Sequence, residues 1–249
     1  MEYQAIFFDR DNTLTYGNPE KNKWRDDIIR SWTNKEFIMN YQKMMKIFDK
    51  AKYPKNGIKT LEEEREFWKR YYYELLIDEG VQEDLQNRSE LLFRELWCNN
   101  DRVLFSEVIE VLDYFKNHGY KMGVISDTSP SLQLTLEQLG LEKYFQSYTC
   151  SDVVGVMKPD PKIYKTALES LGVKAEHSIY VDDYDVEADG ARVLGFTAFH
   201  IDRKGNKNHQ WTIRSLKEIV TYVEKFNNNF NLFDNAEERD GYGDSYREI

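Results

Sequence analysis

Short apolar runs that end abruptly in polar residues recur along the chain. The first covers residues 3–8 and stops at Asp9, and two others, residues 120–125 and 178–181, stop at Ser126 and Asp182. Their length and their aromatic and branched content are typical of strands that are buried on both faces, as in parallel sheets. The sequence therefore predicts three core strands, each followed directly by polar side chains.

Helical patterns lie between and after these strands. Residues 107–117 carry apolar side chains at the spacing i, i+3, i+4 and i+7, and further helices are expected at 130–139, 161–171 and 190–194. Strands that alternate with helices predict an α/β fold with a Rossmann-like, doubly wound parallel sheet. Ligands bind at the carboxyl ends of strands in such sheets, so the polar clusters are the main functional signal.

A long helical block, residues 15–100, interrupts the alternation after the first strand. Apolar positions mark one helix over 61–77 and another over 91–97. We therefore expect an inserted α-helical cap domain at 15–100, a core formed by residues 1–14 and 101–226, and an acidic, flexible tail at 227–249. The block holds four of the five tryptophans, and whether they only fill its core or one or two face a substrate is open at this point.

Composition narrows the class of protein. The chain has 34 Lys+Arg against 44 Asp+Glu, a formal net charge of −10. This excess argues against a partner that is nucleic acid or an anionic membrane, because both need basic surface. An apolar run of about 18 residues, as a membrane span needs, does not occur. The first ten residues lack the pattern of a signal peptide. Cys98 and Cys150 lie too far apart in the sequence to indicate a disulfide framework, so we expect a cytoplasmic protein.

The acidic excess is concentrated near two of the strand ends. Asp9 and Asp11 follow the first strand two residues apart, and residues 181–189 hold five carboxylates without a base. Two like charges at about 4 Å repel by roughly 4 kcal/mol at an effective dielectric constant near 20. A divalent cation reverses the sign of this interaction, and Asp182, Asp183 and Glu187 offer it further oxygens. Oxygen ligands without nearby His or Cys favour Mg²⁺ over zinc.

Two further residues suit the binding of phosphate. Ser126 offers a hydroxyl beside a backbone N–H, and Lys158 offers a positive charge just before the helix that starts near Pro161. A carboxylate nucleophile, a second carboxylate for proton transfer, a cation and a lysine together suit phosphoryl transfer through an aspartyl-phosphate.

These polar residues form four motifs along the chain, at Asp9 with Asp11, at Ser126, at Lys158, and at Asp182 with its neighbours. With the four motifs in this order, the chain resembles the haloacid dehalogenase superfamily, in its phosphatase branch with a helical cap after the first strand. The first motif of the family, Asp-x-Asp-x-Thr, matches residues 9–13, and the second matches Ser126. The third matches Lys158, and the fourth matches Asp182 and Asp183 with Glu187. The resemblance covers roughly residues 1–226.

The resemblance implies a role for each matching residue. Asp9 would be the nucleophile and a metal ligand, and Asp11 would protonate the leaving oxygen and then activate water. Lys158 would bridge the phosphate and Asp9. Residues expected to bind substrate or support its loop are Thr13, Ser126 and Asp127, and those expected to hold Mg²⁺ are Asp9, Asp11 through its backbone carbonyl, Asp182, Asp183 and Glu187. Asn12 departs from the pattern, because Gly is frequent there.

The function expected from these residues is Mg²⁺-dependent hydrolysis of a small phosphorylated metabolite, with the cap setting specificity. A dehalogenase of the superfamily does without the second aspartate of the first motif, so Asp11 argues against that chemistry. A phosphomutase would keep every motif found here. A catalytically silent interaction protein is the alternative from another class. The leaving group and the oligomeric state are not determined by the sequence.

Overall fold

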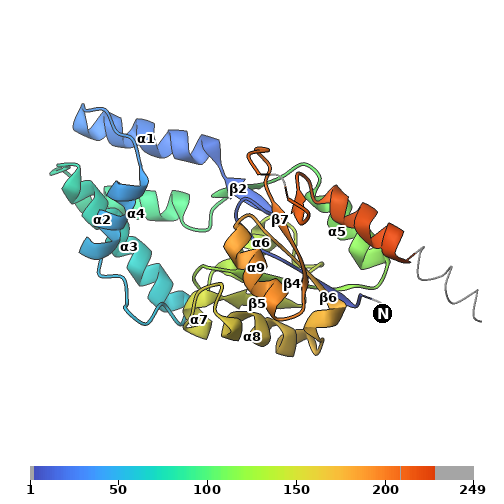
Figure 1. Ribbon diagram of the computed structural model, residues 1–249. Coiled ribbons are helices and arrows are strands. Elements are labelled where there is room, and N and C mark those ends of the chain that lie inside the picture. Colours follow the sequence, from blue (N-terminus) through green and yellow to red (C-terminus); the bar gives the residue numbers. More distant parts are fainter. Residues whose placement is uncertain (1–2, 208, 228–249) are drawn as a thin grey trace, which may run out of the picture.

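The computed structural model describes residues 3–207 and 209–227, and it divides into a sheet-containing core and a helical lobe (Figure 1). Six strands form the core sheet in the order β5-β4-β1-β6-β7-β8, and all neighbours pair in parallel. In sheet order they are β5 (Ser147–Cys150), β4 (Lys121–Ser126), β1 (Ala5–Phe8), β6 (Ser178–Asp182), β7 (Thr197–Ile201) and β8 (Thr212–Ile213). The predicted Rossmann-like α/β fold is confirmed.

Strand β1 lies at the centre of this sheet and is buried on both faces. Ile6 and Phe8 belong to one apolar cluster, while Ala5 and Phe7 belong to the other. The first cluster packs under α5 (Val108–Asn117), α6 (Leu132–Gln138) and the helical residues 217–227, and the second under α8 (Pro161–Leu171) and α9 (Asp185–Val193). Helices on both faces thus explain why the first apolar run shows no alternation of polar and apolar residues.

The helical lobe, residues 19–96, has its own apolar core. It consists of α1 (Pro19–Thr33), α2 (Tyr41–Lys50), α3 (Leu61–Asp78) and α4 (Leu85–Leu96), which pack around Ile29, Ile47, Phe67, Leu75 and Leu92. Two chain segments join it to the core, where β2 (Thr15–Gly17) pairs antiparallel with β3 (Arg102–Leu104). Both segments therefore pass close to the end of β1.

Several local features differ from the sequence predictions. The helix expected at 190–194 begins at Asp185. Acidic residues in the first turn of α9 favour a helix N-terminus, but they interrupt the apolar spacing from which the helix was predicted. Strands β5, β7 and β8, the short α7 (Ser151–Val154) and the 3₁₀ turn η1 (Ala175–His177) were not predicted.

The domain limits stay predictions, and all of the expected tail beyond Asn227 lies outside the described residues. Within the described ranges, no helix has the length and apolar character needed to cross a membrane.

Candidate active site

Three strand ends meet at the carboxyl edge of the sheet. Phe8 of β1 pairs with Val124 of β4 on one side and with Val181 of β6 on the other, so Asp9, Ser126 and Asp182 emerge side by side. The backbone N–H of Asp9 donates to the carbonyl of Val181 at 2.8 Å, which extends the ladder by one residue. All three polar side chains are buried. The structure thus brings the first, second and fourth motifs together.

Lys158 lies in the middle of this group. It comes from the segment between α7 and α8, and its side chain is 2% exposed. The ammonium Nζ lies 2.9 Å from Asp9 Oδ1, 2.7 Å from Asp182 Oδ2 and 2.7 Å from Glu187 Oε2. Gly190 of α9 permits this approach, because a Cβ there would lie 2.5 Å from the Cβ of Pro159. The third motif therefore reaches the other two through one buried lysine.

The site carries more negative than positive charge. Burial raises the pKa of Asp9 to about 7, the neighbouring Asp182 adds to the rise, and Lys158 opposes it. Burial also raises the pKa of Glu187 to about 8 and that of Asp183 to about 6, with Asp182 contributing in both cases. One lysine thus faces four neighbouring carboxylates, which favours the binding of a further cation or a proton.

Asp182 is held differently from an open metal ligand. It is fully buried, and its Oδ2 accepts hydrogen bonds from Lys158 Nζ and from the hydroxyl of Tyr180. Its Oδ1 accepts the backbone N–H of Tyr184 at 2.8 Å. Asp182 thus positions Lys158 as a hydrogen-bond acceptor, and its role as a metal ligand stays a prediction.

Asp183 is more open and is the better candidate ligand. Its Oδ2 accepts a hydrogen bond from Asn12 Nδ2 at 3.0 Å, and its backbone carbonyl accepts one from His200 Nε2 at 3.1 Å. No three His, Cys, Asp or Glu side chains within the described ranges converge as a ready-made metal site. The donor set nevertheless fits Mg²⁺, because it consists of oxygens and carries unbalanced negative charge. The metal roles of the predicted residues stay predictions.

Asp11 lies on the side of the site that faces the helical lobe. Its carboxylate accepts hydrogen bonds from Arg102 Nε at 2.7 Å, Arg10 Nη2 at 2.9 Å and Thr15 Oγ1 at 3.1 Å. Burial alone would raise the pKa of Asp11, but the charges of Arg10 and Arg102 and their hydrogen bonds lower it well below its usual range. In this arrangement Asp11 is an ionised carboxylate that is able to accept a proton.

The residues predicted to bind substrate take different positions. Ser126 is buried beside Asp9 at the end of β4. The carboxylate of Asp127 accepts the backbone N–H of Lys158 at 3.0 Å, so this side chain positions the lysine segment. Thr13 is fully buried, and its hydroxyl makes no hydrogen bond to any residue that the structure describes. Their roles toward substrate stay predictions.

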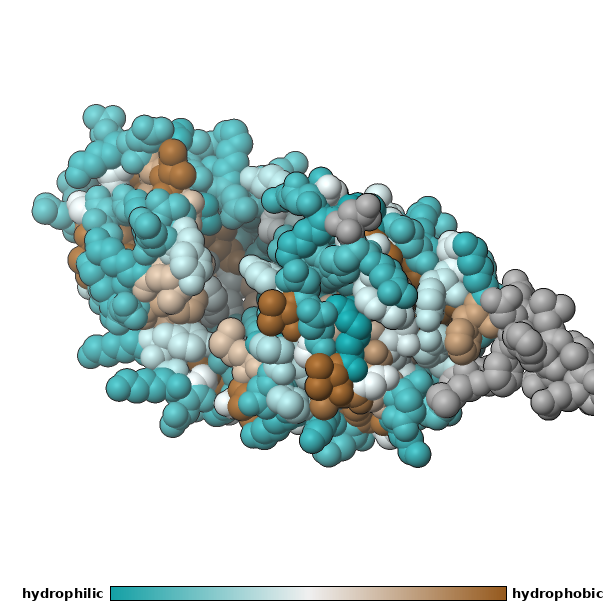
Figure 2. Space-filling view, in the orientation of Figure 1, coloured by the Kyte–Doolittle hydropathy of each residue, from teal (hydrophilic) through white to brown (hydrophobic). Residues whose placement is uncertain are grey.

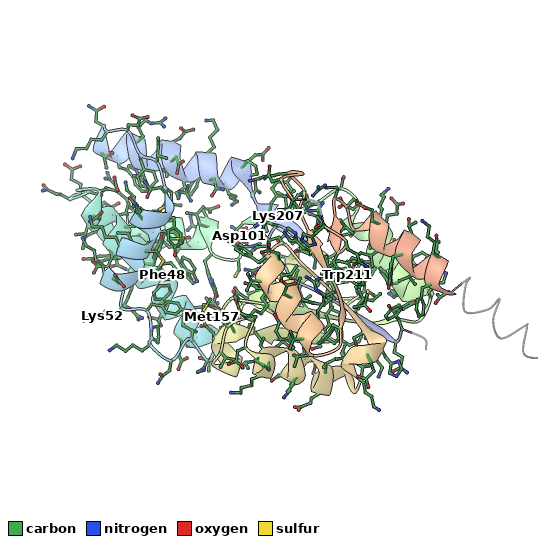
Figure 3. All side chains as sticks on the ribbon, viewed as in Figure 1. Phe48, Lys52, Asp101, Met157, Lys207 and Trp211 are labelled. Carbon is green, nitrogen blue, oxygen red and sulfur yellow. The ribbon has the colours of Figure 1, made fainter. Side chains whose placement is uncertain are left out.

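A cavity of about 370 Å³ lies between the helical lobe and the core. The molecule is hollowed between its two lobes in Figure 2, and Figure 3 labels Asp101 in this region and Phe48 inside the helical lobe. Arg10, Asp11 and Asn12 line the core side of the cavity, and Trp68 and Trp97 line the lobe side. Asp9 and Lys158 do not line it. The cavity therefore meets the site at Asp11.

Comparison with known proteins gives the family. A sequence model described as haloacid dehalogenase-like hydrolase matches residues 3–195. The chain belongs to this family. It is 32% identical over 127 residues to an (S)-2-haloacid dehalogenase of Pseudomonas sp. (strain YL), a stretch that covers 48% of this chain and 55% of the relative. It is 31% identical over 128 residues to a glyceraldehyde 3-phosphate phosphatase of Methanocaldococcus jannaschii, covering 48% of this chain and 56% of the relative. These matches span just over half the length of each relative.

Solved structures share the fold of this haloacid dehalogenase-like hydrolase. A 2-haloacid dehalogenase from Pseudomonas syringae pv. Tomato DC3000 has a TM-score of 0.64 at 21% identity, over 90% of this chain and 99% of that one. A HAD phosphatase from Thermococcus onnurineus has a TM-score of 0.60 at 21% identity, over 88% and 97%. The family resemblance is thus confirmed, and the relatives include both dehalogenases and phosphatases.

Sequence reasoning missed several residues of the site in this family member. Tyr180 carried a readable signal, since side chains at i and i+2 of a strand lie on the same face and Tyr180 precedes Asp182 by two. Arg102 and Arg203 carried none, because each reaches the loop after β1 from a distant part of the chain. Their contacts depend on how β3 and the segment after β7 pack against that loop.

Proposed function

We propose that this hydrolase is a phosphatase that cleaves a small phosphate monoester through an aspartyl-phosphate on Asp9, with Mg²⁺ as its cofactor. The observation that carries the proposal is the pairing of Asp9 with Lys158 at 2.9 Å beside a loop that also presents Asp11. A carboxylate nucleophile, a fixed cation and a second carboxylate are the groups that phosphoryl transfer through an acyl-phosphate needs.

Each group has a defined task in this proposal. A carboxylate oxygen of Asp9 attacks phosphorus, the bond from phosphorus to the leaving oxygen breaks, and Lys158 offsets the negative charge of the transferring group. Asp11, which is ionised at rest, takes up a proton from the monoanion of the phosphate ester and passes it to the leaving oxygen. After the alcohol departs, ionised Asp11 accepts a proton from water, which attacks phosphorus and regenerates Asp9. The two arginines on Asp11 favour this second, ionised state.

Mg²⁺ is proposed because of the charge imbalance at the strand ends. When bound, it neutralises negative charge shared by the phosphate and the carboxylates. Asp9 and Asp183 are the side chains proposed to hold it, with the backbone carbonyl of Asp11. Glu187 forms an ion pair with Lys158 at 2.7 Å, so we propose that it positions the lysine and does not bind the metal directly.

Asp11 favours phosphatase over dehalogenase chemistry. Attack on carbon displaces halide, a leaving group that needs no proton, whereas an alkoxide leaving group does. A carboxylate placed two residues after the nucleophile and held by Arg10, Arg102 and Thr15 has no role in such an attack on carbon. The phosphatase proposal gives it one.

The test is phosphate release from acetyl phosphate with Mg²⁺ and with EDTA. We expect turnover that EDTA abolishes and that Asp9→Asn lowers by about 10³-fold or more. Asp189→Asn is the matched control, because this exposed carboxylate of α9 pairs with Arg192 at the surface. Undiminished turnover in Asp9→Asn or in EDTA contradicts the proposal.

A further inference from the structure

The cavity between the helical lobe and the core has a patch of carbon and sulfur on its lobe side. Met39, Met44, Trp68 and Trp97 line the lobe side, and Asp11 marks the end that meets the site. A cavity of about 370 Å³ is at the lower end of the range of about 300–1,000 Å³ that small-molecule sites show. It is therefore large enough for the leaving group of the ester that the proposed function assumes.

Glu64 of α3 fixes both indole rings of this wall. The carboxylate is 2% exposed, and its Oε1 accepts the indole N–H groups of Trp68 at 3.3 Å and of Trp97 at 3.2 Å. Ser131, at the start of α6 in the core, donates its hydroxyl to Oε1 at 2.6 Å and its backbone N–H to Oε2 at 2.7 Å. One buried carboxylate thus holds the two rings and ties the lobe to the core.

This arrangement removes the polar atoms of the rings from ligand recognition. Both indole N–H donors are used by Glu64, so Trp68 and Trp97 present only carbon to the cavity. Phe93, which does not line the cavity, stacks on Trp97 with ring centroids 5.1 Å apart. The hydroxyls of a sugar or polyol would therefore find no hydrogen-bond partner on these two rings and would lose water where they face them.

The cationic residues of the cavity wall are already paired with acidic ones. These pairs are Arg10 with Asp11, Arg102 with Asp11 and Asp101, Lys21 with Glu95, and Arg25 with Asp26. A carboxylate or a second phosphate on the leaving group would compete with these acidic side chains for the cations. The wall therefore disfavours a second negative charge on the leaving group.

We propose that the leaving group of the substrate carries an uncharged aromatic ring, which lies against Trp68, Trp97, Met39 and Met44. Aromatic rings prefer edge-to-face and offset contacts with one another, and thioether sulfur contacts ring edges favourably. Rings that Glu64 holds in place lose little entropy on binding, so the site is preorganised for such a group. This inference rests on the proposed phosphatase function.

The first test compares acetyl phosphate with three phosphate esters, benzyl phosphate, cyclohexylmethyl phosphate and glycerol 1-phosphate, at the same Mg²⁺ concentration. Acetyl phosphate reports the chemistry at Asp9 with little contribution from the cavity, while benzyl and cyclohexylmethyl phosphate differ in whether the ring is aromatic. We expect a kcat/KM for benzyl phosphate at least tenfold above that for glycerol 1-phosphate and at least threefold above that for cyclohexylmethyl phosphate. Equal values for the two ring esters, or a preference for glycerol 1-phosphate, overturn the inference. Absence of turnover with acetyl phosphate overturns the proposed function instead.

The second test locates the ring. Trp68→Leu is expected to lower the ratio of kcat/KM for benzyl phosphate to that for acetyl phosphate at least tenfold. Trp32→Leu is the matched control, because Trp32 lies against the apolar core of the lobe away from the cavity, and its ratio is expected to stay unchanged. An unchanged ratio in Trp68→Leu overturns the assignment. If that variant does not fold, the independent measurement is the tryptophan fluorescence of the wild type with benzyl alcohol and with glycerol. We expect benzyl alcohol to quench it and glycerol to leave it unchanged. Equal effects of the two alcohols overturn the assignment.

Discussion

At the scale of single residues, Asn12 links the nucleophile loop to the candidate metal ligand. Its φ of 59° lies in the left-handed region, where family members frequently have Gly. Unlike Gly, it has a side chain, whose Nδ2 donates to Asp183 Oδ2 at 3.0 Å. The residue that departs from the family motif thus adds a hydrogen bond that orients Asp183.

Asn12→Gly is expected to weaken Mg²⁺ binding while leaving the fold intact. The backbone conformation suits Gly, so the main loss is one hydrogen bond to a carboxylate, worth about 1 kcal/mol or roughly a fivefold rise in the Kd for Mg²⁺. Isothermal titration of the metal measures this directly. Asn34→Gly is the control, since Asn34 has a φ of 53° at the end of α1, and its Kd should match wild type. An unchanged Kd in Asn12→Gly refutes the link.

At the scale of elements, the segment after β7 holds the loop after β1. Arg203 donates through Nε to the carbonyl of Asn12 at 3.0 Å and through Nη2 to that of Thr13 at 2.6 Å. Its Nη1 pairs with Glu107 at 2.6 Å, and its guanidinium lies 3.5 Å from the ring centroid of Phe105. One side chain thus joins β7, the nucleophile loop and the start of α5.

Arg203→Gln is expected to lower both activity and stability, whereas Glu107→Gln lowers mainly stability. Loss of the arginine releases two loop carbonyls, and a displaced nucleophile costs roughly tenfold or more in kcat. Either variant also loses the half-buried ion pair between Arg203 and Glu107, which costs about 1–3 kcal/mol of unfolding free energy. Acetyl phosphate turnover and urea unfolding separate the two effects. A kcat for Arg203→Gln equal to that of Glu107→Gln would remove the loop-positioning role.

At the scale of the whole molecule, the net charge of −10 is partly a property of the strand ends. The pKa values of Asp9, Asp183 and Glu187 are raised to about 7, 6 and 8. A carboxyl whose folded pKa lies above its unfolded value stabilises the fold at low pH and loses that contribution as the pH rises through the folded pKa. The lowered pKa of Asp11 has the opposite effect on stability. Its contribution changes only at pH values below about 4, the usual pKa of an aspartate, and so outside the range of these three raised pKa values.

In EDTA, the unfolding free energy is therefore expected to fall as the pH rises from about 5 to 8. Mg²⁺ should stabilise the protein more at pH 8 than at pH 5, because the carboxylates are ionised at the higher pH. Urea unfolding at a series of pH values measures both effects. Asp183→Asn removes one titrating group and should flatten the profile. A stability in EDTA that is constant or rises over this range contradicts the charge account.

The sequence predicted the fold and the convergence of the motifs because both follow from local patterns and one topological rule. Apolar runs place the strands, and parallel strands present their carboxyl ends at one edge, so Asp9, Ser126 and Asp182 were expected to meet. The partners of each side chain were not predictable in this way. Lys158 and Asp9 are 149 positions apart, and Glu64 and Ser131 are 67 positions apart. Such contacts depend on the packing of whole elements, which periodicity does not encode.

The most direct test of the central claim is the chemical state of Asp9 during turnover. Acid quenching of the enzyme with acetyl phosphate and Mg²⁺, followed by peptide mass spectrometry, reports any group bound to this residue. We predict one phosphoryl group on the peptide that contains Asp9 in the wild type, and none in Asp9→Asn. Phosphate release from an enzyme whose Asp9 is never phosphorylated, with a phosphoryl group on another residue or on none, would contradict the account.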